Sequence, residues 1–183
     1  MRISEDRYSR DRLRLDLALR FMRHGARTQT IRLWTGLTDD RIRKLNHSYG
    51  VATSCHQLRP RGRSPRRATY FIRSTRLQEE TAVLASICAL LGVLPSPAKP
   101  ADPNLLPGIV RGELLCMAFE SYLRLVPDPH ISFEHAVLLV MALVRGDEIT
   151  CMRCASCGAL WVTECMSLFV NDCLDCVRER GGG

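Results

Sequence analysis

The chain has 183 residues, enough for one domain or two small ones, and 46% of them are apolar, so it can bury a hydrophobic core. Its longest nearly uncharged apolar run, about residues 81–95, is shorter than the ~20 residues of a membrane-spanning helix. The first residues contain no apolar signal sequence. We therefore expect a cytoplasmic protein without a membrane partner, in which cysteine thiols stay reduced.

The formal net charge of +7 is unevenly distributed along the chain. Residues 1–76 contain 19 Arg and Lys against six Asp and Glu, which leaves +13. Residues 77–183 contain seven against 13, which leaves −6. Because 18 of the 19 basic residues in the first part are Arg, whose planar guanidinium suits phosphates and guanine edges, the asymmetry favours nucleic-acid binding over an ordinary solvated basic surface.

Apolar residues at helical spacing predict a mainly α-helical fold. Residues 1–10 are polar, and we expect them to be frayed. Helices are expected over 11–24 and 26–35, and Gly36 should end the second one. Thr38 can then cap a third helix. Two helices joined by a short glycine-containing turn are typical of a helix-turn-helix segment.

The third helix has one apolar stripe, formed by Ile42, Leu45 and Tyr49. If that stripe packs inward, the other side of the helix presents basic residues to a DNA major groove. The pattern also fits any three-helix bundle, and a single helix histidine is more simply a solvated one. With the charge asymmetry, DNA binding is the favoured interpretation, and the candidate residues are Arg41, Arg43, Lys44 and His47.

Residues 50–68 alternate arginines with Pro, Gly and Ser, which disfavours regular structure. One interpretation is a flexible arm that neutralises DNA phosphates along the backbone or in the minor groove. A disordered basic loop without a defined contact is an equally good one. The arginines of the arm are Arg59, Arg61, Arg63, Arg66 and Arg67.

The rest of the chain predicts a helical core and a small terminal module. Further helices are expected over 70–91, 109–126 and 131–145, with Cys88 as a buried thiol. The last helix is apolar around most of its circumference, which is typical of a helix buried between others or in a subunit interface. The expected units are a basic helix-turn-helix-like segment with its Arg-rich loop, a helical core and assembly region, and a zinc-ribbon or knuckle module with a short tail, covering residues 1–76, 77–149 and 150–183.

Six of the nine cysteines lie between positions 151 and 176. Two Cys-x-x-Cys pairs separated by 15 residues fit one Zn²⁺ held by four thiolates. Cys151, however, forms an overlapping pair with Cys154. Gly158 favours the later pair, because a zinc knuckle turns sharply after its second cysteine and glycine tolerates the positive φ of that turn. The predicted ligands are Cys154, Cys157, Cys173 and Cys176.

Residues 160–163 should form a strand that leaves the knuckle, and residues 168–170 should return from a hairpin with Cys165 near its tip. Four thiolates would close the coordination shell, so we expect a structural site and not an enzyme. A metal-free cluster of reduced thiols is the alternative. A thioredoxin-like redox motif is disfavoured because no βαβ pattern surrounds the cysteines.

Four segments resemble a known family in order and spacing over about residues 13–177. They are residues 17–29, residues 35–45, the loop 61–65, and the two cysteine pairs with Gly158. The chain resembles FlhC, the zinc-containing subunit of the bacterial flagellar master transcriptional activator. The first two segments are the more diagnostic, because four-cysteine knuckles occur in many unrelated proteins.

The resemblance implies a mostly helical transcriptional activator subunit that assembles with FlhD subunits in a hetero-oligomer. Its partners would be double-stranded promoter DNA and RNA polymerase, and its effect would be activation of flagellar operons and motility. The resemblance also implies Zn²⁺ on the same four cysteines. A zinc-knuckle scaffold that binds RNA or an acidic protein is the alternative function.

Overall fold

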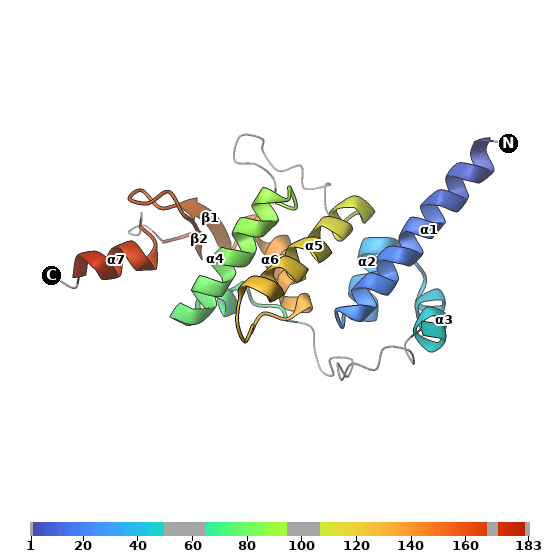
Figure 1. Ribbon diagram of the computed structural model, residues 1–183, viewed down its shortest axis with the longest axis horizontal. Coiled ribbons are helices and arrows are strands. Elements are labelled where there is room, and N and C mark those ends of the chain that lie inside the picture. Colours follow the sequence, from blue (N-terminus) through green and yellow to red (C-terminus); the bar gives the residue numbers. More distant parts are fainter. Residues whose placement is uncertain (1, 50–64, 95–106, 168–171, 182–183) are drawn as a thin grey trace.

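The computed structural model describes residues 2–49, 65–94, 107–167 and 172–181. The fold is mainly helical with one small two-stranded sheet, in agreement with the predicted fold class. Figure 1 shows an elongated arrangement in which the first three helices lie at one end and the last helix lies at the other. The elements in chain order are α1 (Arg2–Arg23), α2 (Thr28–Thr35), α3 (Asp39–Tyr49), the 3-10 helix η1 (Ala68–Ile72), α4 (Thr75–Leu90), α5 (Ile109–Leu125), α6 (Phe133–Arg145), β1 (Ile149–Arg153), β2 (Leu160–Glu164) and α7 (Leu174–Gly181).

Helix α1 begins at Arg2, so the prediction that residues 1–10 fray is wrong. The apolar periodicity marks only the part of a helix that packs on a core. In α1 that part includes Leu17, Ala18 and Phe21, which are fully buried, whereas residues 7–10 are exposed. The preceding turns can be helical without leaving a hydrophobic pattern, because Arg and Glu have high intrinsic helix propensity.

The turn between α2 and α3 follows the prediction. Gly36 ends α2 with a φ of 70°, and its N–H donates to the Arg32 carbonyl at 2.9 Å. Thr38 Oγ1 accepts a hydrogen bond from the Arg41 N–H at 3.4 Å, as an N-cap does. Ile42 is fully buried, but Tyr49 is 56% exposed, so its predicted burial is wrong. Tyr49 is the last residue of α3 and keeps a large solvent-exposed surface at that end.

One cluster of buried apolar side chains runs from α1 through α6 to the sheet. The rings of Phe21 and Phe133 meet edge to face at 4.9 Å between centroids, and Phe119 meets Phe133 at 5.2 Å. Gly112 lets α1 and α5 approach closely, because a Cβ there would lie 2.7 Å from Leu17 Cδ2. As predicted, α6 is largely buried.

The helix predicted over 70–91 is divided into η1 and α4. Ser74 caps α4 by accepting a hydrogen bond from the Leu77 N–H at 3.4 Å, and it thereby starts a new helix. Cys88 is fully buried, as predicted, and burial raises the pKa of its thiol to about 12. Within the described residues, no helix is long and apolar enough to cross a lipid bilayer.

Strand β2 confirms the strand expected over 160–163, but its partner is β1, which precedes the knuckle. The two strands are antiparallel, with Cys151 opposite Val162. The tip of this hairpin therefore carries the first cysteine pair. Cys165 lies at the opposite end, directly after β2, where its N–H donates to the Glu148 carbonyl at 3.1 Å. Its predicted position near a hairpin tip concerns a different hairpin, formed with residues 168–170, and stays a prediction. The returning strand predicted over 168–170 lies outside the described residues.

Candidate metal centre

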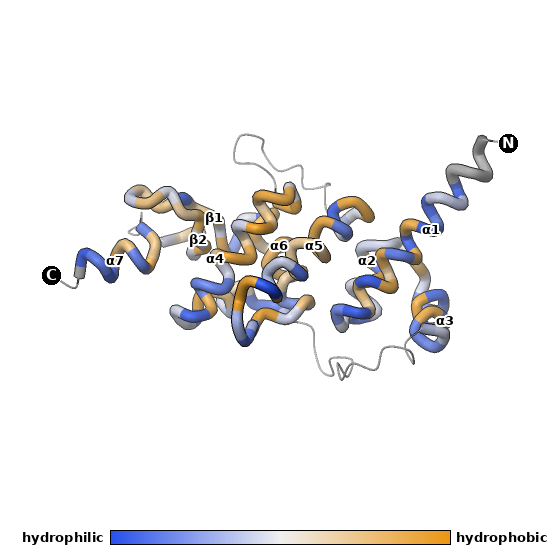
Figure 2. Tube along the Cα trace, in the orientation of Figure 1, coloured by the Kyte–Doolittle hydropathy of each residue, from blue (hydrophilic) through white to orange (hydrophobic). Residues whose placement is uncertain are grey.

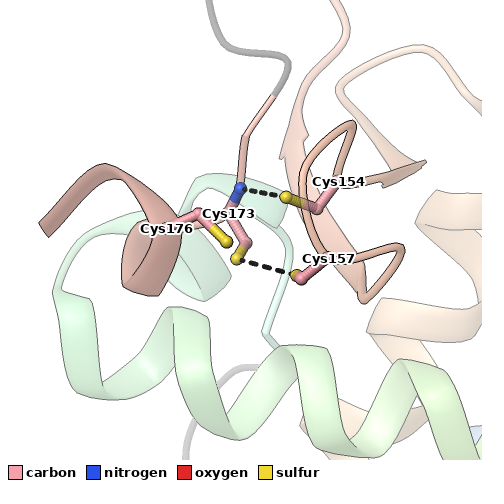
Figure 3. Close-up of side chains that lie close together, drawn as sticks. All are labelled: Cys154, Cys157, Cys173 and Cys176. Carbon is pink, nitrogen blue, oxygen red and sulfur yellow. Dashed lines mark hydrogen bonds between the residues drawn. The ribbon is translucent and has the colours of Figure 1, made fainter. Parts of the chain in front are cut away.

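Four cysteine sulfurs meet at the C-terminal end of the molecule, all within 4.8 Å of one another. Figure 3 shows the first pair on the hairpin tip that follows β1 and the second pair at the start of α7. These are the four cysteines predicted from the ligand spacing and Gly158: Cys154, Cys157, Cys173 and Cys176.

The hairpin tip is a tight loop closed by its own backbone. The Gly158 N–H donates to the Cys154 carbonyl at 2.9 Å, and the Cys154 N–H donates to the Ala159 carbonyl at 2.8 Å. Gly158 has a φ of 73°, the left-handed conformation that a side chain disfavours. Cys151 is outside this loop because it lies in β1 and packs against the main core, where burial raises its pKa to about 11.

The second cysteine pair is attached to the tip by polar contacts. The Cys173 N–H donates to Cys154 Sγ at 3.3 Å. The Asp172 carboxylate accepts a hydrogen bond from Ser156 Oγ at 2.7 Å and also forms an ion pair with Arg180. Trp161, on β2, packs against Cys154 and Cys173.

The donor set fits a single tetrahedral ion. A Zn–S bond of about 2.3 Å in tetrahedral geometry places two sulfurs about 3.8 Å apart, and Cys157 Sγ lies 3.6 Å from Cys173 Sγ. This separation is far longer than the ~2.05 Å of a disulfide bond. Four thiolates are a soft donor set that suits Zn²⁺ or an iron–sulfur centre and not Mg²⁺ or Ca²⁺. The four cysteines can therefore bind one metal ion.

The sulfurs differ in how readily they lose a proton. Backbone N–H groups of Cys157 and Cys173 point at the Cys154 sulfur and lower its pKa to about 6. Hydrogen bonding of the Cys176 thiol to the sulfurs of Cys157 and Cys173 raises the pKa of Cys176. One thiolate is thus favoured near neutral pH, whereas further negative charges repel one another. A divalent cation offsets that repulsion with its own charge, so that the bound thiols lose their protons.

The sequence did not point to the residues that support the cysteines. Asp172, Ser156, Arg180 and Trp161 stand in no ligand pattern. The weak indications were the position of Asp172 directly before a cysteine and of Ser156 inside a Cys-x-x-Cys pair. Arg180 is harder to find, because only the turn of α7 brings it back to Asp172.

The candidate DNA-binding residues of α3 lie at the other end of the molecule from the cysteines (Figure 1). All four are exposed. Arg41 pairs with Asp11 of α1 at 3.4 Å, and Arg43 pairs with Asp40 at 3.3 Å. Arg59, Arg61 and Arg63 lie outside the described residues, and the arginines of the arm that the structure describes, Arg66 and Arg67, are exposed just before η1.

No protein-family model matches the chain, and a search of curated proteins finds no significant match. The likeness to FlhC therefore depends on the four sequence segments alone.

Proposed function

We propose that the chain is a DNA-binding transcriptional activator subunit of the FlhC type, which acts in a hetero-oligomer with FlhD subunits at flagellar promoters together with RNA polymerase. The observation that carries the proposal is the basic exposed side of α3, which follows a glycine turn. The four-segment resemblance supplies the family and the partner.

The packing of α3 supports a DNA-contacting role. Ile42 is fully buried against the body, and successive residues of a helix are rotated by about 100°. Lys44 and His47 consequently project away from the buried stripe and are exposed. Arg41 and Arg43 pair only with solvent-exposed carboxylates, and such pairs contribute about 0–1 kcal/mol. They can exchange these carboxylates for groups on DNA at small cost.

Assembly with other subunits is supported by apolar side chains that the chain leaves exposed in its acidic half. Leu90 at the end of α4 is 86% exposed, and Val110 at the start of α5 is 74% exposed. Figure 2 shows strongly hydrophobic positions along both helices. Exposed apolar surface of this kind is typical of interaction sites.

For the cysteine cluster we propose one structural Zn²⁺ and no catalytic role. Four protein ligands leave no open position for a substrate or an activated water. Zn²⁺ would join the hairpin tip to α7, and metal binding would contribute to folding of that region.

The proposal is tested by a gel-shift salt titration of the complex reconstituted with FlhD. Replacing Arg43 and Lys44 by Gln should relax base preference, whereas replacing Arg61 and Arg63 should weaken binding to all sequences alike. Arg124→Gln, an exposed residue of α5 with the same charge change, is the control and should bind as the unchanged chain does.

Three results would count against the proposal. A flat salt response would contradict binding through many phosphates. Equal behaviour of the two variant pairs would contradict the division between base and phosphate contacts. Preferential competition by RNA over duplex DNA would favour the RNA-binding alternative.

A further inference from the structure

A cavity of about 560 Å³, open to solvent on one side, lies where η1, the first turn of α6 and the end of β2 come together. It is separate from the cysteines and from α3. Its lining includes three arginines, one tyrosine and one histidine. The residues that matter for its chemistry are Arg66, Arg67, Tyr70, Arg73, His135 and Glu164.

Arg73 is held in place by a stack of three side chains. Its guanidinium carbon lies 4.5 Å from the centroid of the Tyr70 ring, a cation–π geometry. Tyr70 in turn stacks on His135, with 4.2 Å between ring centroids and 21° between planes. The Tyr70 hydroxyl donates to the His130 carbonyl at 3.2 Å, which fixes the ring further. The guanidinium is therefore oriented before any ligand arrives.

The charges of the lining do not cancel. Three arginines face one carboxylate, that of Glu164. Burial, followed by repulsion from Arg73 and Arg27, lowers the pKa of His135 and favours its neutral form. Among the described residues, Arg66, Arg67 and Arg73 form no ion pair with a carboxylate at 4.0 Å or less. The cavity thus has an excess of about two positive charges.

We infer that this cavity binds a small organic phosphomonoester, with its phosphate on the three arginines. A phosphomonoester carries about −1.5 to −2 at pH 7, which matches the excess charge of the lining. Planar guanidinium groups bind phosphate oxygens in pairs. The volume lies within the roughly 300–1,000 Å³ of small-molecule sites, so there is room for an organic part beside Ile72 and Thr69.

A DNA backbone phosphate is the other source of the same chemistry. A diester carries one negative charge, however, whereas the three arginines and one carboxylate of the lining leave an excess of about two positive charges. The inference therefore removes Arg66 and Arg67 from the predicted phosphate-binding arm. It does not depend on the proposed function, because the cavity does not involve α3 or the FlhD-type partner.

The test is isothermal titration of the full chain at pH 7.5 with glucose 6-phosphate. Two control probes are used. Glucose lacks the phosphate, and dimethyl phosphate lacks the second negative charge. We expect saturable binding of glucose 6-phosphate alone. Arg73→Gln should weaken it about tenfold or more, since a hydrogen bond to a charged group is lost. Arg124→Gln should leave it within about twofold, because Arg124 is outside the cavity.

Tyr70→Leu removes the stack and keeps all three arginines, so it should also weaken binding if the orientation of Arg73 matters. Arg67→Gln changes an exposed residue, so the variant should fold even if the Arg73 or Tyr70 variant does not. It should also weaken binding of glucose 6-phosphate, because one of the three arginines is lost. Absence of saturable binding, or equal binding of dimethyl phosphate, would overturn the inference. Displacement of bound glucose 6-phosphate by short duplex DNA would instead assign the cavity to backbone phosphates, and would also overturn it.

Discussion

The two ends of the molecule are held together by different forces. At the N-terminal end, α1, α2 and α3 share fully buried apolar side chains such as Phe21, Ile31 and Ile42 with the body. At the C-terminal end, the hairpin tip and α7 meet through four sulfurs and the contacts of Asp172. Outside that cluster, α7 reaches the body through an exposed ion pair between Arg178 and Glu79 at 3.1 Å.

This difference concerns what each end requires in order to stay folded. Burial of apolar area stabilises the N-terminal helices whether or not a metal ion is bound. Among its described residues, the C-terminal module has a small cluster of three buried ones, two of which are cysteines. Its order should consequently depend on whether the sulfurs have a metal ion to share.

The largest expected effect is therefore metal removal or Cys173→Ser. Cys173→Ser removes one of four ligands, so we expect bound metal to fall from one ion per chain to almost none. Structural Zn²⁺ contributes about 10–16 kcal/mol to the folding of isolated zinc-finger peptides, so the loss of metal should also unfold the module. Amide hydrogen exchange should show that α7 and the hairpin tip lose protection. Protection of α1, α5 and α6 should change little.

The matched control is Cys165→Ser. Cys165 is not part of the cluster, and its thiol donates to the Gly146 carbonyl at 3.2 Å. It should keep the metal and the protection of α7. If chelation instead unfolded both ends together, the two ends would not be stabilised independently, because the module would then be coupled to the main core.

The second prediction concerns the single fully buried residue of α3. Ile42→Ala leaves a cavity under the helix, and changes of this kind cost about 2–5 kcal/mol. The loss should appear in urea denaturation, and α3 should lose hydrogen-exchange protection first. Leu33→Ala, at a position of α2 that is 52% exposed, is the control and should cost much less. Equal losses would mean that α3 is not anchored through Ile42.

The two ends also differ in how far the sequence predicts them. The cysteine set follows from local features, namely ligand spacing and the left-handed turn at Gly158. The position of α3 against α1 does not, because periodicity shows which residues share a side but not where a neighbouring helix stops. This is why Ile42 was predicted correctly and Tyr49 was not.

The hairpin was missed for a related reason. Pairing between β1 and β2 joins residues on either side of the knuckle, and Cys151 has the spacing of a ligand rather than of a strand residue. Gly158 excludes Cys151 as a ligand, but only the structure shows that Cys151 lies in a strand that packs on the main core. The cavity beside η1 could not be predicted from the sequence either, since it combines residues from η1, α6 and β2 that are far apart in the chain.

The third prediction tests the polar tie that supplements the apolar contact between α1 and α5. Arg20 forms two hydrogen bonds to the Glu120 carboxylate, at 3.0 and 2.8 Å, and His24 Nε2 lies 2.9 Å from the same group. Glu120→Gln leaves Arg20 with Glu113 and should cost about 1–3 kcal/mol. Glu79→Gln, which removes an exposed pair, should cost less than about 1 kcal/mol.

The pH dependence has a definite sign. The hydrogen bond from Arg20 lowers the pKa of Glu120 below 4.5, and burial lowers the pKa of His24 below 6.5. In both cases the unfolded chain binds protons more readily, so stability falls as pH falls. Unfolding free energy should decline from pH 6.5 downward through His24 and more steeply below 4.5 through Glu120. Glu120→Gln should reduce the steeper part and leave the share of Glu80, whose burial is outweighed by hydrogen bonds that lower its pKa as well. An unchanged curve would contradict the role of the pair.

The smallest expected effect on stability is that of Arg43→Gln. Its partner Asp40 lies in the same helix, and both side chains are more than 70% exposed. Surface pairs of this kind contribute about 0–1 kcal/mol, so the unfolding free energy should stay within about 0.5 kcal/mol of the unchanged chain. If α3 contacts DNA, the same variant should nevertheless relax the base preference of binding. A loss of binding accompanied by an equal loss of stability would show that Arg43 maintains the helix and does not contact a ligand.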